Sequence, residues 1–124
     1  MNAMKLIPLL KVTSMKDAVS FYTGILDFEL TYPDEGLNIF CVDLKNAGAE
    51  LQLTQVDSMF GVALHVYADE VDAIYAKYIS RGLDVSKKKE SPVHQGPLNQ
   101  SWGRREFYVT DTGNNTLRFT SPIK

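Results

Sequence analysis

The sequence has few of the residues that build covalent or metal-based sites. Among its 124 residues are one cysteine, one tryptophan and two histidines. A lone cysteine, Cys41, cannot form an internal disulfide or a cysteine-rich zinc cluster, which is typical of a protein kept in a reducing compartment. The two histidines also mean that any metal chemistry would have few nitrogen ligands.

Long hydrophobic runs and a strong excess of charge are lacking as well. No apolar segment approaches the roughly 20 residues that a membrane-spanning helix needs. Residues 1–11 lack the basic start, apolar stretch and cleavage site of a signal peptide. With 13 basic and 15 acidic residues the net charge is -2, which argues against a nucleic-acid partner because phosphate binding needs a basic surface. We expect a cytoplasmic protein without nucleic-acid or membrane partners.

The first half of the chain predicts a strand, a helix and three further strands. Ser14 is a hydroxyl N-cap, and the apolar positions 15, 18, 19, 22 and 26 that follow it recur at helical spacing. Apolar runs bounded by turn residues predict the strands. These expected strands span 6–13, 28–32, 37–44 and 49–54.

The second half repeats the same order. A strand at 61–67 precedes a helix that Asp69 can cap and Gly82 can end in a left-handed conformation. Another strand is expected to begin at 83–85, and 87–100 is expected to be a long polar loop. Strands at 104–110 and 115–120 should form a hairpin through the turn residues 111–114.

The pattern is therefore βαβββ, written twice. We expect an α+β fold in one domain, 1–124, made of module 1 (about 5–55) and module 2 (about 60–121). The two modules should form a curved mixed sheet with helices on its convex face. The opposite face would be a groove and the default ligand site.

Two stretches of the sequence carry a resemblance to a known family. One is Ile7 to Val12 with the following Phe21-Tyr22 and Leu26-Asp27-Phe28. The other is Ser101 to Asp111 with the following Gly113-Asn114 and Leu117. Together they resemble the vicinal oxygen chelate superfamily, which includes glyoxalases, extradiol dioxygenases, fosfomycin-resistance enzymes and bleomycin-resistance proteins. The second stretch is similar to the bleomycin-resistance-like branch, which implies a homodimer with ligand grooves between subunits.

The resemblance also implies where a metal would lie in the enzymes of the superfamily. Four groove-lining positions hold it there, and they match Ile7, Gln52, Ala63 and Arg118 here. Only the amide oxygen of Gln52 is a conceivable weak ligand, and the fixed cation of Arg118 repels a divalent ion. We therefore expect no metal or cofactor and assign no catalytic residue.

Strand alternation predicts which side chains line the groove. If Arg118 faces it, Leu117 and Phe119 face the helices, and the hairpin places Tyr108 opposite Arg118. By the same alternation Ala63 implies His65 on the groove face, and Gln52 implies Glu50 and Thr54. The predicted ligand-binding residues are Phe40, Gln52, His65, Trp102, Glu106, Tyr108 and Arg118.

Several of these side chains have an alternative structural role. Trp102 can stack on a planar ligand or simply pack over its loop. Arg118 can bind an acidic ligand, but an internal ion pair with Glu106 is favoured. His65 can act chemically or only as a hydrogen-bonded strand residue. His94, in the polar loop, is expected to be exposed.

The favoured hypothesis is a metal-free small-molecule binding protein that captures a planar or amphipathic ligand, as in antibiotic resistance by sequestration. The alternative is a glyoxalase-like lyase or isomerase, or a dioxygenase-type enzyme. Its metal site would be displaced, with His65, Glu50 and Glu106 as candidate ligands. An acid–base enzyme using His65 with Glu106, or an inert scaffold, would also fit the pattern.

Overall fold

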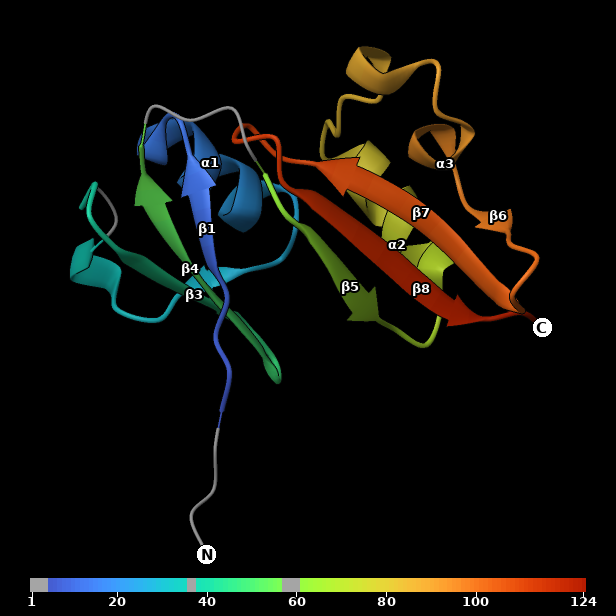
Figure 1. Cartoon of the computed structure of the whole chain (residues 1–124), viewed down its shortest axis with the longest axis horizontal. Helices are drawn as coiled ribbons and strands as arrows, with labels where there is room; N and C mark the ends of the chain where they lie inside the picture. The colour runs from blue at the N-terminus through green and yellow to red at the C-terminus, as the bar shows by residue number, and fades with distance from the viewer. Residues whose placement is uncertain (1–4, 36–37, 57–60) are drawn as a thin grey trace, which may run out of the picture. The chain divides into compact units, whose positions relative to one another are not determined.

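Two successive βαβββ modules make up the chain (Figure 1). This computed structural model describes residues 5–35, 38–56 and 61–124. The chain divides into two compact units: unit 1 comprises 1–61 with 112–114, and unit 2 comprises 62–111 with 115–124. The predicted arrangement of a single domain, with module limits near 55 and 60, stays a prediction, and residue 60 lies outside the described residues.

Unit 1 has a four-stranded mixed sheet in the order β1-β4-β3-β2. Strand β1 runs parallel to β4, and the other neighbours are antiparallel. The elements are β1 (Leu9–Val12), α1 (Met15–Gly24), β2 (Glu29–Leu30), η1 (Pro33–Glu35), β3 (Val42–Asn46) and β4 (Ala49–Gln55).

The start of α1 and the core beneath it follow the sequence pattern. The Ser14 hydroxyl accepts a hydrogen bond from the Asp17 amide at 3.2 Å, which confirms the predicted N-cap. One face of α1 is buried, and the strands contribute alternate side chains to the same core. This core consists mainly of aliphatic residues, among them Leu10, Val12, Met15, Val42, Leu44, Leu51 and Leu53.

The predicted strand at 37–44 is partly wrong. Strand β3 begins only at Val42, residues 38–41 form no strand, and Leu37 lies outside the described residues. Phe40, predicted to line the groove from a strand, lies in this connecting segment and is 79% exposed.

Unit 2 repeats the topology with the sheet order β5-β8-β7-β6. Strand β5 is parallel to β8, while β7 is antiparallel to both β8 and β6. The elements are β5 (Ala63–Tyr67), α2 (Val71–Ser80), η2 (Ser86–Lys88), α3 (Pro92–Gln95), β6 (Leu98–Asn99), β7 (Arg104–Thr110) and β8 (Thr116–Pro122).

The connection between α2 and β7 differs from its prediction. No strand forms at 83–85, and the loop predicted at 87–100 contains η2, the short helix α3 and strand β6. Pro92 is compatible with a helix here because it occupies the first turn, where its missing N–H costs nothing. The Gln95 side chain then holds the segment together by donating to the carbonyl oxygens of Val85 and Lys88.

The ends of α2 give one correction and one confirmation. Its N-cap is Glu70 rather than the predicted Asp69, and the Glu70 side chain makes no capping bond. Instead, the amide of Val71 donates to the Ser121 hydroxyl of β8 at 3.4 Å. Gly82 follows the helix with φ of 93°, as predicted for a left-handed C-terminal glycine.

The core of unit 2 is aromatic. The rings of Phe107 and Phe119 stack with centroids 4.8 Å apart, and Tyr78 of α2 meets both rings edge-on. Val109 and Leu117 are buried on the same side of the sheet. This confirms the prediction that Leu117 and Phe119 face the helix.

The tip of the β7–β8 hairpin, residues 112–114, belongs to unit 1. The Thr13 hydroxyl donates to the Thr112 carbonyl at 3.3 Å. A Cβ atom on Gly113 would lie 2.4 Å from the backbone oxygen of Lys11, so only glycine fits this approach. Within the described residues, no helix has both the length and the apolar character to cross a membrane.

Candidate functional site

One face of the unit 2 sheet carries most of the predicted site residues. The register pairs Arg118 of β8 with His65 of β5 and, as the sequence predicted, with Tyr108 of β7. Because the intervening residues of β7 and β8 are buried beneath α2, these side chains lie on the opposite face. We call this the open face and define it by His65, Tyr67, Trp102, Arg104, Glu106, Tyr108, Thr110, Arg118 and Thr120.

Glu106 is the centre of the open face and is almost completely buried. One carboxylate oxygen accepts a hydrogen bond from the Trp102 indole N–H at 3.2 Å. The other accepts from the Tyr108 hydroxyl at 3.2 Å and lies 3.6 Å from Nη2 of Arg118. The predicted ion pair of Arg118 with Glu106 is therefore confirmed, and both oxygens of the acid are engaged.

Trp102 combines a fixed N–H with an exposed ring. Its side chain belongs to the turn before β7, and the residue is 57% exposed. The hydrogen bond to Glu106 restricts the ring while leaving apolar surface open to solvent. An indole held in this way can stack on a planar molecule without first losing much conformational freedom.

Arg118 joins the acid to His65. Its Nη2 donates to the Tyr108 hydroxyl at 2.5 Å, its Nη1 lies 3.1 Å from Nε2 of His65, and its Cζ lies 4.7 Å from the centroid of the Tyr108 ring. The Nε atom is buried and has no hydrogen-bond partner among the described residues. An unsatisfied buried donor is costly and needs an explanation.

Sequence reasoning missed two neighbours of this group. Arg104 donates from Nε to the Thr120 hydroxyl at 2.9 Å and lies over the Tyr67 ring, with Cζ 4.8 Å from its centroid. The signal for Arg104 was present, because it stands two residues before Glu106 on one strand and must share its face.

His94 is the second missed residue, and its predicted exposure is wrong. Helix α3 makes the ring half-buried, edge-on to Tyr108, with Nδ1 2.9 Å from the Ser91 hydroxyl and Nε2 3.0 Å from the Thr110 hydroxyl. Burial, assisted by the charge of Lys88, holds the pKa of His94 below its ordinary value of 6.5. No local pattern predicts the short helix α3, so the burial of His94 was not predictable.

The predicted site residues of unit 1 form a smaller group. Gln52 of β4 is half-buried and donates from Nε2 to the Asp43 carboxylate at 2.8 Å. Glu50, on the same side of the strand, forms an ion pair with Lys5. No ligand role is tested for these residues, for Phe40 or for the open face, so those roles stay predictions.

The four positions that match the metal-holding positions of the enzymes that the sequence resembles do not fit a metal here. Ile7 and Ala63 have no donor atoms, Arg118 carries a positive charge, and the Gln52 amide is hydrogen-bonded to Asp43. Within residues 5–35, 38–56 and 61–124, no group of three or more His, Cys, Asp or Glu side chains is arranged to hold an ion. We derive no chemical step through a metal from these residues.

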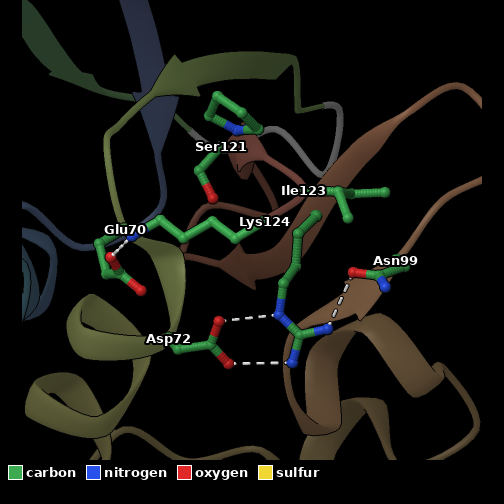
Figure 2. A pocket seen from close by; sticks show the side chains of 8 residues that line it. Glu70, Asp72, Asn99, Ser121, Ile123 and Lys124 are labelled. Atoms are coloured by element: carbon green, nitrogen blue, oxygen red, sulfur yellow. Dashed lines mark hydrogen bonds and ion pairs between the residues drawn. The ribbon is translucent and has the colours of Figure 1, made fainter.

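A pocket of about 310 Å³ is lined by residues of unit 2 (Figure 2). The β7 and β8 residues that line it include Arg105 and Ser121, which alternate with open-face residues. The remaining lining comes from the start of α2, from β6 and from the chain end. Its residues are Glu70, Asp72, Asn99, Arg105, Ser121, Pro122, Ile123 and Lys124.

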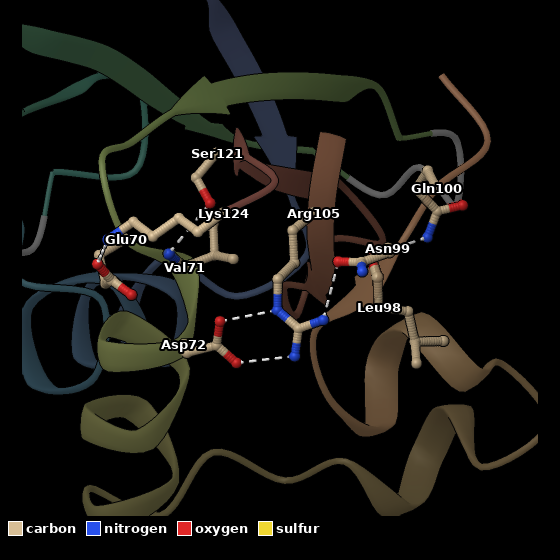
Figure 3. A network of polar contacts seen from close by, with 9 residues as sticks. All are labelled: Glu70, Val71, Asp72, Leu98, Asn99, Gln100, Arg105, Ser121 and Lys124. Carbon is tan, nitrogen blue, oxygen red and sulfur yellow. Dashed lines mark hydrogen bonds and ion pairs between the residues drawn. The ribbon is translucent and has the colours of Figure 1, made fainter. Parts of the chain in front are cut away.

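The charges in this pocket neutralise one another (Figure 3). Arg105 binds both carboxylate oxygens of Asp72, at 2.8 and 2.9 Å, and donates to Asn99 at 3.0 Å, while Lys124 pairs with Glu70. The bond from Arg105 holds the pKa of Asp72 below its ordinary value of 3.8. Because these groups already satisfy one another, the pocket stabilises the end of the sheet and is a weaker ligand candidate than the open face.

No protein-family model and no curated protein matches the sequence. Solved structures do match. The bleomycin resistance determinant encoded on transposon Tn5 has a TM-score of 0.76 at 16% identity, over 98% of this chain and 100% of that one. For a bleomycin-binding protein of Streptomyces verticillus, solved with copper(II)-bleomycin, the TM-score is 0.71 at 19% identity, over 99% of both chains.

An enzyme has the same architecture. The lactoylglutathione lyase of Agrobacterium tumefaciens has a TM-score of 0.70 at 15% identity, over 97% of this chain and 95% of that one. At such identities the likeness speaks to architecture and leaves activity open. The chain therefore has the tandem βαβββ fold of the glyoxalase and bleomycin-resistance proteins, the fold that its sequence resemblance implied.

Proposed function

We propose that this protein is a small-molecule binding protein of the bleomycin-resistance type, which captures a planar or amphipathic ligand on the open face of unit 2. The observation that carries the proposal is the group formed by Trp102, Glu106, Tyr108 and Arg118. It presents an exposed aromatic ring beside a fixed set of hydrogen bonds. Pre-organised aromatic and polar groups of this kind are what small-molecule sites need.

Capture fits these residues better than metal-dependent catalysis does. The matched metal positions lack suitable donors, and both oxygens of Glu106 are already hydrogen-bonded. The likeness to bleomycin-binding structures supports binding, and the likeness to a lyase keeps the enzyme alternative open. The proposal includes a cytoplasmic homodimer, with Gln52 and Phe40 of unit 1 kept as predicted ligand-binding residues.

A titration followed by NMR tests the proposal. The chain has one tryptophan, so its indole N–H gives a single signal that reports on Trp102 directly. Bleomycin and a panel of planar heterocycles should include a compound that shifts this signal and raises the melting temperature. A ligand at about a hundred times its Kd stabilises by roughly 2.7 kcal/mol.

Two variants and one assembly measurement complete the test. Trp102→Ala should weaken binding, whereas Trp102→Phe should retain part of it because a flat ring remains. Light scattering should give the mass of a dimer. Binding that survives Trp102→Ala unchanged contradicts the proposed site, and a bound metal that depends on His65 would favour the enzyme instead.

A further inference from the structure

We propose that the open face selects ligands in which a flat aromatic ring carries an anionic group such as a carboxylate. This inference rests on the proposed function of the open face and adds the chemical class of its ligand.

The balance of charge on the open face is positive. Two arginines, Arg104 and Arg118, stand against one acid, Glu106. The acid is almost fully buried, and both its oxygens are hydrogen-bonded. A cationic ligand would therefore find no free carboxylate here, whereas an anion would meet a surplus guanidinium.

Unused donors lie on the same face. Of the three side-chain nitrogens of Arg104, Nε is hydrogen-bonded, and the two terminal amino groups have no hydrogen-bond partner within the part of the chain that the structure describes. The Tyr67 ring beneath the guanidinium and the bond to Thr120 fix its plane. A fixed planar fork with two free amino groups matches the geometry of a carboxylate.

Trp102 supplies the aromatic contact beside these donors. Its N–H binds Glu106, which stands two residues from Arg104 on β7. Alternate residues of a strand are spaced by roughly 7 Å, about the length of a fused two-ring aromatic acid. A ring on Trp102 would therefore bring its carboxylate toward Arg104.

Three probes with the same ring system test the inference. They are 2-naphthoate, which is anionic, 2-naphthamide, which is neutral, and 2-naphthylmethylammonium, which is cationic. Calorimetry measures affinity, and the Trp102 indole signal reports whether binding occurs at the open face. We expect 2-naphthoate to bind at least about tenfold more tightly than the amide, and the cation to bind most weakly.

Matched arginine variants locate the anion. Arg104→Met should weaken the binding of 2-naphthoate about tenfold and leave the affinity for 2-naphthamide nearly unchanged. Arg105→Met is the control, because Arg105 is the next residue on the strand but faces α2 and pairs with Asp72. Arg118→Met is less suitable alone, because it leaves the buried Glu106 without its cation. The double variant Glu106→Gln/Arg118→Met avoids that charge.

The outcomes separate the inference from the proposed function. If the amide or the cation shifts the Trp102 signal with at least the affinity of 2-naphthoate, the anionic class is wrong while the site itself stands. An equal loss in Arg104→Met and Arg105→Met also overturns the assignment. If none of the three probes shifts the signal, the inference fails, and a shift by other planar compounds then decides the proposed function.

Discussion

Each sheet has a row of three side chains that lie side by side on neighbouring strands, and the two rows occupy equivalent positions but differ in chemistry. In unit 1, Gln52 of β4 stands between Leu9 of β1 and Asp43 of β3. In unit 2, Arg118 of β8 stands between His65 of β5 and Tyr108 of β7. In both rows a side chain on the inner strand donates to its antiparallel neighbour.

The difference lies in what surrounds each donor. The bond from Gln52 ends at Asp43, whereas the bond from Arg118 continues through Tyr108 and Glu106 to Trp102. The cores differ as well: the first is mainly aliphatic, with Tyr22 and Phe28 in an edge-on aromatic contact, whereas the second is built around the stacked rings of Phe107 and Phe119. One backbone plan thus accepts two sets of side chains, and the second combines an exposed aromatic ring with one surplus guanidinium.

The largest expected effect comes from the cores. Phe107→Ala removes a ring that stacks on Phe119 and meets Tyr78, so it should lower the free energy of unfolding by about 4 kcal/mol. Leu53→Ala, at a buried position in the core of unit 1, should cost about 3 kcal/mol. Urea denaturation measures both. A loss below about 1 kcal/mol for Phe107→Ala would mean that the aromatic core does not stabilise unit 2.

The second largest effect is expected from the polar side chains on the two sheets, whose removal should cost different amounts of stability. Glu106→Ala leaves Arg118 without its acid and two donors without an acceptor, so we expect a loss of about 3 kcal/mol. Gln52→Ala removes one hydrogen bond and should cost about 1 kcal/mol. Denaturation gives the energies, and the indole signal of Trp102 should move only in Glu106→Ala. Equal losses would show that the longer network adds nothing to stability.

Sensitivity to mild acid should belong to unit 2, which contains His94. The pKa of His94 is below 6.5 in the folded protein because the ring is buried. As the pH falls through 6.5 toward that lowered pKa, the unfolded chain binds more protons than the folded one, so stability decreases. Above 6.5 this contribution is fully present.

Replacing His94 by Gln should reduce that decrease. Chemical denaturation at about pH 7.5 and about pH 5.5 gives the free energy of unfolding, and the loss between the two pH values is compared between the unmodified protein and His94→Gln. Lys88→Met is the matched control, because it removes a positive charge that lowers the pKa of His94. The pKa should then lie closer to 6.5, so the pH range over which stability decreases should be narrower. An unchanged pH dependence in His94→Gln would assign the effect to other groups.

The smallest effect is expected from the paired charges of the pocket. Asp72→Asn breaks an exposed ion pair with Arg105 and should cost at most about 1 kcal/mol, with less effect at high salt. The pKa of Asp72 is lowered in the folded protein, so its contribution is present above 3.8 and disappears as the pH falls further. If Asp72→Asn lowered the free energy of unfolding as much as Glu106→Ala does, the ion pairs of the pocket would stabilise the protein as strongly as the open-face network, contrary to this prediction.

Alternation made much of this arrangement predictable. Once Arg118 was assigned to one face, the turn at 111–114 determined that Tyr108 stands opposite and that Glu106 shares its face. The ion pair between Glu106 and Arg118 followed from opposite charges on neighbouring strands. The N-cap at Ser14 and the glycine after α2 carried local signals of equal clarity.

The errors arose where tertiary contacts decide the conformation. The segment 87–100 is polar and contains two prolines, and its helix α3 has only four residues, too short for a periodic pattern. Contacts made by Gln95 and His94 hold it, and neither has a local signature. The segment before β3 was likewise read as a strand from its apolar residues, although residues 38–41 form none.

The hairpin tip that belongs to unit 1 has a consequence for synthesis. Residues 1–61 emerge from the ribosome before residues 62–111, but their unit also includes Gly113 and its two neighbours, which are made only after residues 62–111. Early domains commonly fold while the chain is still growing. Here the first unit must wait for this late segment, so its final packing and that of the second unit are completed almost together.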